Sequence, residues 1–182
     1  MALVKSKLQN PLRDLFEGTN GFPPSQADAA ANLAAIYRTY ATDAAAAATK
    51  PVAALLTTAG NTLGSALTAA FTAAQDAGPS GVATLGLAMD AAFVAFWLAP
   101  PMTFVFPITG TVTIAGVVTV VTPGVLGPAL TSLFLAGAAG GPTAAQQAQG
   151  LATALDTWTR TVMVVNTPIT PPGPPTPPIP LA

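Results

Sequence analysis

Leucine and phenylalanine occur four residues apart at three places in this chain: Leu12 and Phe16, Leu67 and Phe71, and Leu130 and Phe134. Residues spaced four apart lie on the same face of a helix, so each pair predicts the apolar side of one helix. Glycines follow each phenylalanine, where a helix is expected to end. A proline then stands eight residues after each phenylalanine, at Pro24, Pro79 and Pro142.

A second helix is predicted after each proline. Ser25, Ser80 and Thr143 follow the prolines directly and suit the N-cap position, where a side-chain oxygen accepts a backbone N–H. An alanine-rich stretch comes next and ends in large aromatic residues, at Tyr37 and Tyr40, Phe96 and Trp97, and Trp158. The pattern predicts three helical hairpins, at about residues 8–45, 60–99 and 127–160. They are either copies of one repeat or a coincidence of low-complexity sequence.

The residues between the second and third hairpins are of a different kind. Pro100 and Pro101 end the helix. Residues 102–121 are β-branched and aromatic runs separated by Pro107, Gly110 and Gly116, which predict a β-hairpin or a three-stranded meander. Residues 161–166 predict one more strand that could pair with it. The expected fold class is therefore mainly α, repeated helical hairpins with a small β element.

The C-terminal residues 168–182 are dominated by proline, as polyproline II segments are. The sequence thus divides into a globular domain at 1–167 and an extended arm at 168–182. Because such a segment makes no internal hydrogen bonds, we expect the arm to lie along a neighbouring subunit.

Charged residues make up only 7% of the 182 residues, and the net charge is −1. Ordinary soluble domains carry about 25%. Much of the surface is therefore expected to face other protein subunits or lipid. No basic cluster indicates nucleic-acid binding. Cysteine and histidine are absent, which removes thiol chemistry and the commonest general base. The N-terminus has no apolar run before Arg13 and does not fit a signal peptide.

Candidate catalytic groups are few. Asp14 and Glu17 could form a carboxylate pair, but a solvated helix face beside Arg13 explains them better. Asp90 lies within an apolar helix, and we expect it at the polar edge or paired with Lys50 or Arg160. Asp156 and Arg160, four residues apart, predict an ion pair. The sequence therefore predicts no enzyme, no catalytic residue, no metal and no cofactor.

A membrane protein is the main alternative. Residues 81–99 are mostly apolar and approach the ~20 residues that a membrane span needs. In that case Phe93, Phe96 and Trp97 would face lipid. However, Asp90 at the midpoint is unfavourable in lipid, and the strands of residues 102–121 would leave an open sheet edge there. Trp97 and Trp158 are more simply explained as core residues.

The stretches Trp97–Phe104 and Thr157–Val162, with the proline-rich end, resemble small Ala-, Thr- and Pro-rich virion structural proteins of tailed bacteriophages. The resemblance extends over most of the chain and lies in its general composition and in the order of its segments. It implies a structural component present in several copies, bridging or cementing larger virion proteins, with the tail or baseplate preferred over head decoration. It implies other virion proteins as partners and the virion as location, and no catalytic residue.

The expected interfaces are the strand from Val162 to Val165, the hairpin from Thr111 to Val121 and the arm from Pro171 to Leu181. The arm could instead present prolines to an aromatic groove in a partner domain. Nine side chains are the candidate contacts: Val112, Val120, Val162, Val164, Pro171, Pro174, Pro177, Ile179 and Leu181.

Overall fold

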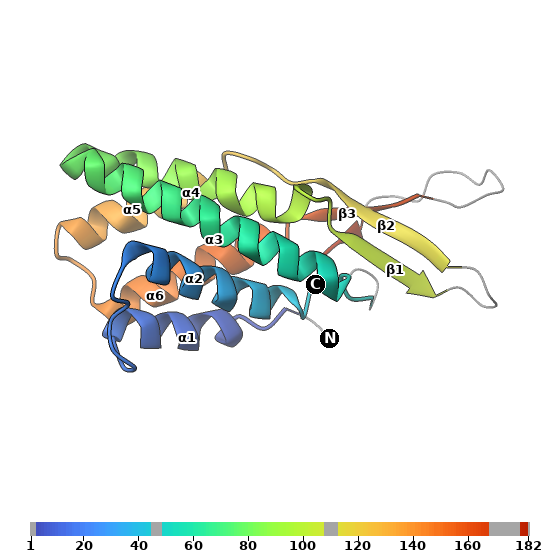
Figure 1. Cartoon of the computed structure of the whole chain (residues 1–182), viewed down its shortest axis with the longest axis horizontal. Coiled ribbons are helices and arrows are strands. Elements are labelled where there is room, and N and C mark those ends of the chain that lie inside the picture. Colours follow the sequence, from blue (N-terminus) through green and yellow to red (C-terminus); the bar gives the residue numbers. More distant parts are fainter. Residues whose placement is uncertain (1–2, 45–48, 108–112, 168–178, 182) are drawn as a thin grey trace.

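Six helices form the body of the protein in the computed structural model, which describes residues 3–44, 49–107, 113–167 and 179–181. They are α1 (Ser6–Glu17), α2 (Gln26–Ala41), α3 (Ala53–Asp76), α4 (Gly81–Leu98), α5 (Leu126–Ala138) and α6 (Ala144–Thr159). Each helix packs against the next one in the chain, and α6 packs against α1 (Figure 1). The helices therefore close into a ring, and the predicted class, mainly helical with a small β element, is confirmed.

The three predicted hairpins are α1–α2, α3–α4 and α5–α6. Two of their predicted caps are present. Ser25 accepts the N–H of Asp28, and Thr143 forms a reciprocal capping box with Gln146. The predicted Ser80 cap is wrong, because its hydroxyl donates to the Ala77 carbonyl and a short 3₁₀ turn, Gly78–Ser80, leads directly into α4. Gly18, with φ of 65°, ends α1 in the left-handed region that favours glycine.

The aromatic residues that end the second helix of each hairpin meet in one cluster. The ring centroid of Tyr37 lies 4.7 Å from that of Phe93 and 5.0 Å from that of Phe96. The Tyr37 hydroxyl accepts the indole N–H of Trp97 at 2.9 Å and shares a hydrogen bond with Thr159 at 2.8 Å. The cluster therefore joins all three hairpins near one end of the ring.

At the other end, Phe16, Phe71 and Phe134 line one apolar cavity. Each lies on the first helix of its hairpin, and Leu33, Met89 and Leu151 line the same cavity from the second helices. Corresponding positions of the three hairpins thus occupy corresponding places in the ring, which gives the sequence repeat a structural meaning.

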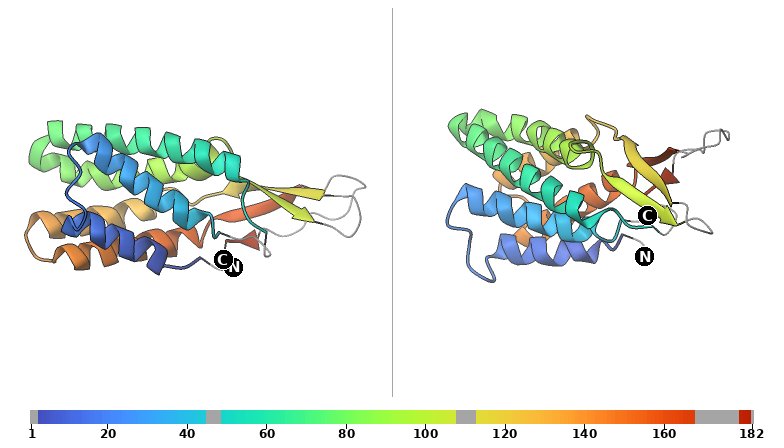
Figure 2. Two further views of the ribbon diagram at one scale, coloured as in Figure 1. Left: turned by 60° about the horizontal axis from the view of Figure 1, so that its bottom comes forward. Right: turned by 45° about the vertical axis from the view of Figure 1, so that its right-hand side comes forward.

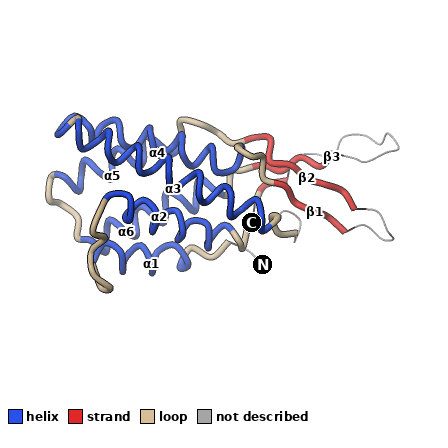
Figure 3. The backbone as a smooth tube through the Cα atoms, viewed as in Figure 1, coloured by secondary structure: helices blue, strands red, loops and turns tan. Residues whose placement is uncertain are grey.

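A four-stranded antiparallel sheet extends from the aromatic end of the ring in the order β1–β2–β3–β4 (Figure 3). The strands are β1 (Thr103–Pro107), β2 (Thr113–Val120), β3 (Met163–Thr167) and β4 (Ile179–Pro180). The predicted pairing of the 161–166 region with the hairpin is confirmed. Of the two arrangements predicted for residues 102–121, the β-hairpin is confirmed and the three-stranded meander is wrong, because β2 continues through Gly116 as one strand.

Helix packing depends on small residues at the crossings. On α2 and α3, Ala34 lies opposite Gly64, where an added Cβ would be 3.7 Å from the alanine methyl. On α4, an added Cβ at Gly86 would lie 2.5 Å from the Thr131 nitrogen and 2.6 Å from the Gly127 oxygen of α5. Since real Cβ atoms do not approach backbone this closely, the α4–α5 crossing requires glycine at position 86.

Candidate functional site

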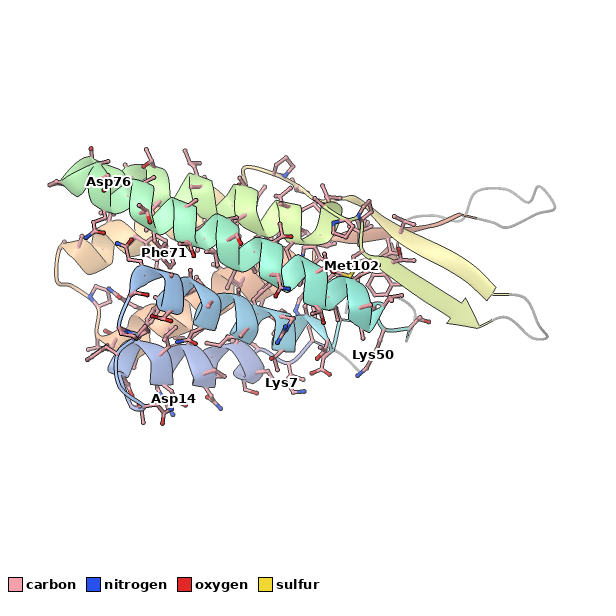
Figure 4. All side chains as sticks on the ribbon, viewed as in Figure 1. Lys7, Asp14, Lys50, Phe71, Asp76 and Met102 are labelled. Carbon is pink, nitrogen blue, oxygen red and sulfur yellow. The ribbon has the colours of Figure 1, made fainter. Side chains whose placement is uncertain are left out.

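The surface of the ring has a charged half and an uncharged half. From Pro51 to Leu155 the only charged residues are Asp76 and Asp90, and Asp90 is buried. All other charges lie on α1, α2 and α6 or on the segments beside them. The neighbouring helices α3, α4 and α5 therefore form a face with a single exposed charge, Asp76 at its end (Figures 1 and 4).

We call the exposed residues of α3, α4 and α5, without Asp76, the uncharged face. On α4 and α5 eight of these eleven residues are alanine or leucine: Ala83, Thr84, Leu87, Ala88, Ala91, Pro128, Ala129, Ser132, Leu135, Ala136 and Ala138. Leu87 and Leu135 are 55% and 49% exposed. A groove of about 780 Å³ continues the face between α5 and α6, with Val125, Leu133 and Trp158 among its lining residues.

Five of the six hydroxyl side chains of α3 have their donors satisfied within the helix itself. Thr57, Thr58, Thr62, Ser65 and Thr68 each donate a hydroxyl hydrogen bond to the carbonyl four residues earlier in the same helix. A polar group is costly to remove from water mainly when its hydrogen bond is lost. These hydroxyls can therefore be covered by a partner without losing their bonds, which lowers the cost of desolvating this part of α3.

Asp90 is buried inside the ring of helices. Its side chain is 4% exposed, and one carboxylate oxygen, Oδ2, accepts the backbone N–H of Gly124 at 2.6 Å. Gly124 precedes α5, so the carboxylate lies near the positive end of that helix. Both expectations for Asp90 are wrong: it is buried and so does not lie at the polar edge of α4, and Lys50 and Arg160 bind Asp43 and Asp156 instead.

The charged half carries three ion pairs around two carboxylates, near the end of the ring from which the sheet extends. Asp43 is almost buried and binds Lys7 and Lys50, the latter at 3.5 Å. The Lys7 hydrogen bond lowers the pKa of Asp43, and the opposing effect of burial does not outweigh it. For Asp156, burial acts to raise the pKa, but hydrogen bonds from Arg160 and Tyr40 lower it. The predicted Asp156–Arg160 pair is thereby confirmed, at 3.0 Å.

These shifts predict a loss of stability in acid. Because both folded-state pKa values lie below the unfolded values, the two carboxylates stabilise the fold at neutral pH and cease to do so as they become protonated. The free energy of unfolding should be level near pH 7 and fall below about pH 5. Urea unfolding at a series of pH values from 7 down to about 2 checks this. An Asp43→Asn variant should show a shallower fall, and a fall as steep as the parent's would contradict the assignment.

Asp14 and Glu17 do not form a catalytic pair. Asp14 is half-buried and Glu17 is exposed, and each lies near Arg13, at 3.8 and 3.9 Å. This is the solvated helix face that the sequence favours. Within the described ranges, no three His, Cys, Asp or Glu side chains lie together in a way that could hold a metal ion. Trp97 and Trp158 are core residues, 0% and 2% exposed.

The predicted contact residues have different outcomes. Val162, Val164 and Leu181 are buried within the chain's own core, so they are not exposed for a partner. The backbone of Ile179 pairs with β3 of the same chain, and the Leu181 N–H donates to the Val162 carbonyl. The described end of the arm, residues 179–181, therefore packs on the sheet of its own chain. Val120 lies in β2. Val112, Pro171, Pro174 and Pro177 lie outside the described residues.

No protein-family model, no curated protein and no solved structure matches this chain. The uncharged face is thus the feature from which function must be argued. Its signal in the sequence is the nearly charge-free run from Pro51 to Leu155, whereas the interface prediction followed strands and prolines instead. The run becomes a single face only because α3, α4 and α5 are neighbours in the ring.

Proposed function

We propose that this protein is a structural component of a bacteriophage virion, not an enzyme, and that it bridges or cements larger subunits through the uncharged face. The observation that carries the proposal is the separation of charge around the ring. A protein surrounded by water needs charge over its whole surface. An interface core is instead depleted of charged residues, as the uncharged face is.

The tail or baseplate is the preferred place, on the resemblance of segments such as Trp97–Phe104 to small virion proteins. The alternative within the same class is a protein that decorates the head. Both need a subunit that offers a broad apolar surface and keeps its own fold. The ring meets the second need, because Phe93, Phe96 and Trp97 are fully buried inside it.

A membrane-inserting protein is the second candidate class. Among the described residues, Gly78–Leu98 is long and apolar enough to cross a membrane by length and composition, with a mean hydropathy of 1.7. In the ring, however, this stretch is partly a core helix. The residues expected to face lipid, Phe93, Phe96 and Trp97, point into the aromatic cluster. Insertion would require the ring to open.

Fractionation of an infected culture separates these classes. An antibody against the purified protein should detect it in gradient-purified particles, and it should remain after a high-salt wash because apolar contacts do not weaken with salt. A Leu87→Lys/Leu135→Lys variant should fold, since both side chains are largely exposed, and should be depleted from particles. The matched control, Ala35→Lys on the charged half, should be incorporated normally. Recovery in the membrane fraction, with none in particles, would overturn the proposal.

A further inference from the structure

The two ends of the ring carry opposite charges. The loops that connect the helices within each hairpin lie at one end, here called the turn end, and the sheet lies at the other, the sheet end (Figure 2). The turn end has four acidic residues and one arginine: Asp14, Glu17, Asp28, Asp76 and Arg13. The sheet end has five basic and two acidic residues: Lys5, Lys7, Arg38, Lys50, Arg160, Asp43 and Asp156.

The charges that remain outside the ion pairs of the chain have the same sign as the end of the ring on which they lie. Both acidic residues of the sheet end are held in ion pairs, Asp43 by two lysines and Asp156 by Arg160. In the described part of the chain, Lys5 and Arg38 have no acidic partner, and Asp28 and Asp76 have no basic one. Figure 4 shows Asp14 and Asp76 at the end opposite Lys7 and Lys50.

The turn end is also hollow and apolar. The cavity lined by Phe16, Phe71 and Phe134 has a volume of about 400 Å³, and none of its lining residues is charged. Phe22 belongs to that lining and is 73% exposed. A largely exposed aromatic ring beside an apolar cavity indicates a contact site. The acidic residues at this end make it a poor site for a carboxylate or phosphate ligand.

The sheet end carries a matching apolar residue. Val4 is 42% exposed and directly precedes Lys5, at the start of the chain's described residues. The basic sheet end thus presents an apolar side chain flanked by a lysine, and the acidic turn end presents an apolar ring above a cavity. The two ends complement each other in charge and in apolar character, and they are ends of the same molecule.

We infer that copies of this chain associate head to tail, with the turn end of one copy against the sheet end of the next. Phe22 and the cavity mouth are then covered by the segment around Val4 and Lys5 of the neighbour. Contacts between two turn ends or two sheet ends would place like charges together, which opposes a symmetric end-to-end dimer. A head-to-tail contact joins two different surfaces, so further copies can be added until they form a closed cyclic oligomer or a filament. The inference does not depend on the uncharged face or on the virion.

Two end variants test the inference on detergent-free full-length protein. The turn-end variant is Phe22→Asn/Asp76→Asn and the sheet-end variant is Val4→Ser/Lys5→Gln. All four side chains are partly or largely exposed, so circular dichroism should match that of the parent, and so should the melting temperature in ~500 mM salt, where the parent is expected to be monomeric. The substitutions remove charge without reversing it, so the two altered ends do not attract each other.

Light scattering after size exclusion gives the mass. The parent should form oligomers in ~50 mM salt and shift towards monomer in ~500 mM salt, because the free charges are exposed and screened. Each variant alone should be monomeric. An equimolar mixture should give a dimer and nothing larger, since one intact turn end meets one intact sheet end. A monomeric parent at low salt, oligomers that persist in both variants, or a mixture that stays monomeric would each overturn the inference. In all three cases the proposed role of the uncharged face would stand.

Discussion

Replacing Gly86 by alanine is expected to lower the free energy of unfolding by about 2 kcal/mol or more, as overpacking of a tight core does. The added Cβ would lie 2.6 Å from the Gly127 oxygen, which belongs to the backbone of α5 and cannot rotate away. The helices α4 and α5 must therefore separate, and the buried contacts of Met89 and Leu130 loosen with them. Urea unfolding followed by circular dichroism measures the change.

The matched control is Gly64→Ala on α3. Its Cβ would meet the Ala34 methyl at 3.7 Å, an ordinary van der Waals contact. Alanine is favoured over glycine inside a helix by up to ~1 kcal/mol. The control should therefore unfold at the same or a higher urea concentration than the parent. Equal destabilisation by the two substitutions would show that the close approach of α4 and α5 is not the cause of the loss of stability in Gly86→Ala.

Replacing Trp97 by alanine should cost about 3–5 kcal/mol, the usual range for a fully buried aromatic residue. Trp97 is 0% exposed, its ring packs edge-on against Phe96 at 5.2 Å, and its N–H binds Tyr37. The substitution leaves a void and removes one hydrogen bond to the Tyr37 hydroxyl. Trp158 remains as the single tryptophan of the variant, so fluorescence can follow its unfolding in urea.

Phe22→Ala is the comparison for Trp97→Ala, since Phe22 is an aromatic residue that is 73% exposed. Surface substitutions change stability by about 0.5 kcal/mol or less. The urea midpoint of Phe22→Ala in ~500 mM salt, where the parent is expected to be monomeric, should therefore lie close to that of the parent. If Trp97→Ala unfolded at the same urea concentration as Phe22→Ala, the aromatic cluster would not be the core that joins the three hairpins.

The helical hairpins could be predicted because their signals are local. Leu and Phe spacing, the caps at Ser25 and Thr143 and the glycine at Gly18 act within one or two turns of helix. The closing of the ring could not be predicted in this way. The contact between α1 and α6 joins the two ends of the chain, and nothing in either helix indicates its partner.

The site was only partly predictable for a similar reason. The low charge content indicated a surface that faces something other than water. It did not indicate which surface, because that depends on the order of the helices around the ring. The place of residues 179–181 could not be predicted, because the proline content of the arm suggests an extended segment with no partner in its own chain. The contact that holds its end, from the Leu181 N–H to the Val162 carbonyl, is made by backbone atoms and leaves no sequence pattern.

Thiol labelling of single-cysteine variants tests the role of the uncharged face most directly. The chain contains no cysteine, so each variant reports one position. Ala88→Cys on α4 and Ala35→Cys on α2 are both exposed, and both should react with a maleimide in the purified protein. In intact particles, we predict that position 88 becomes protected while position 35 still reacts. Equal reaction of both positions in particles would contradict the assignment of the uncharged face as the contact surface.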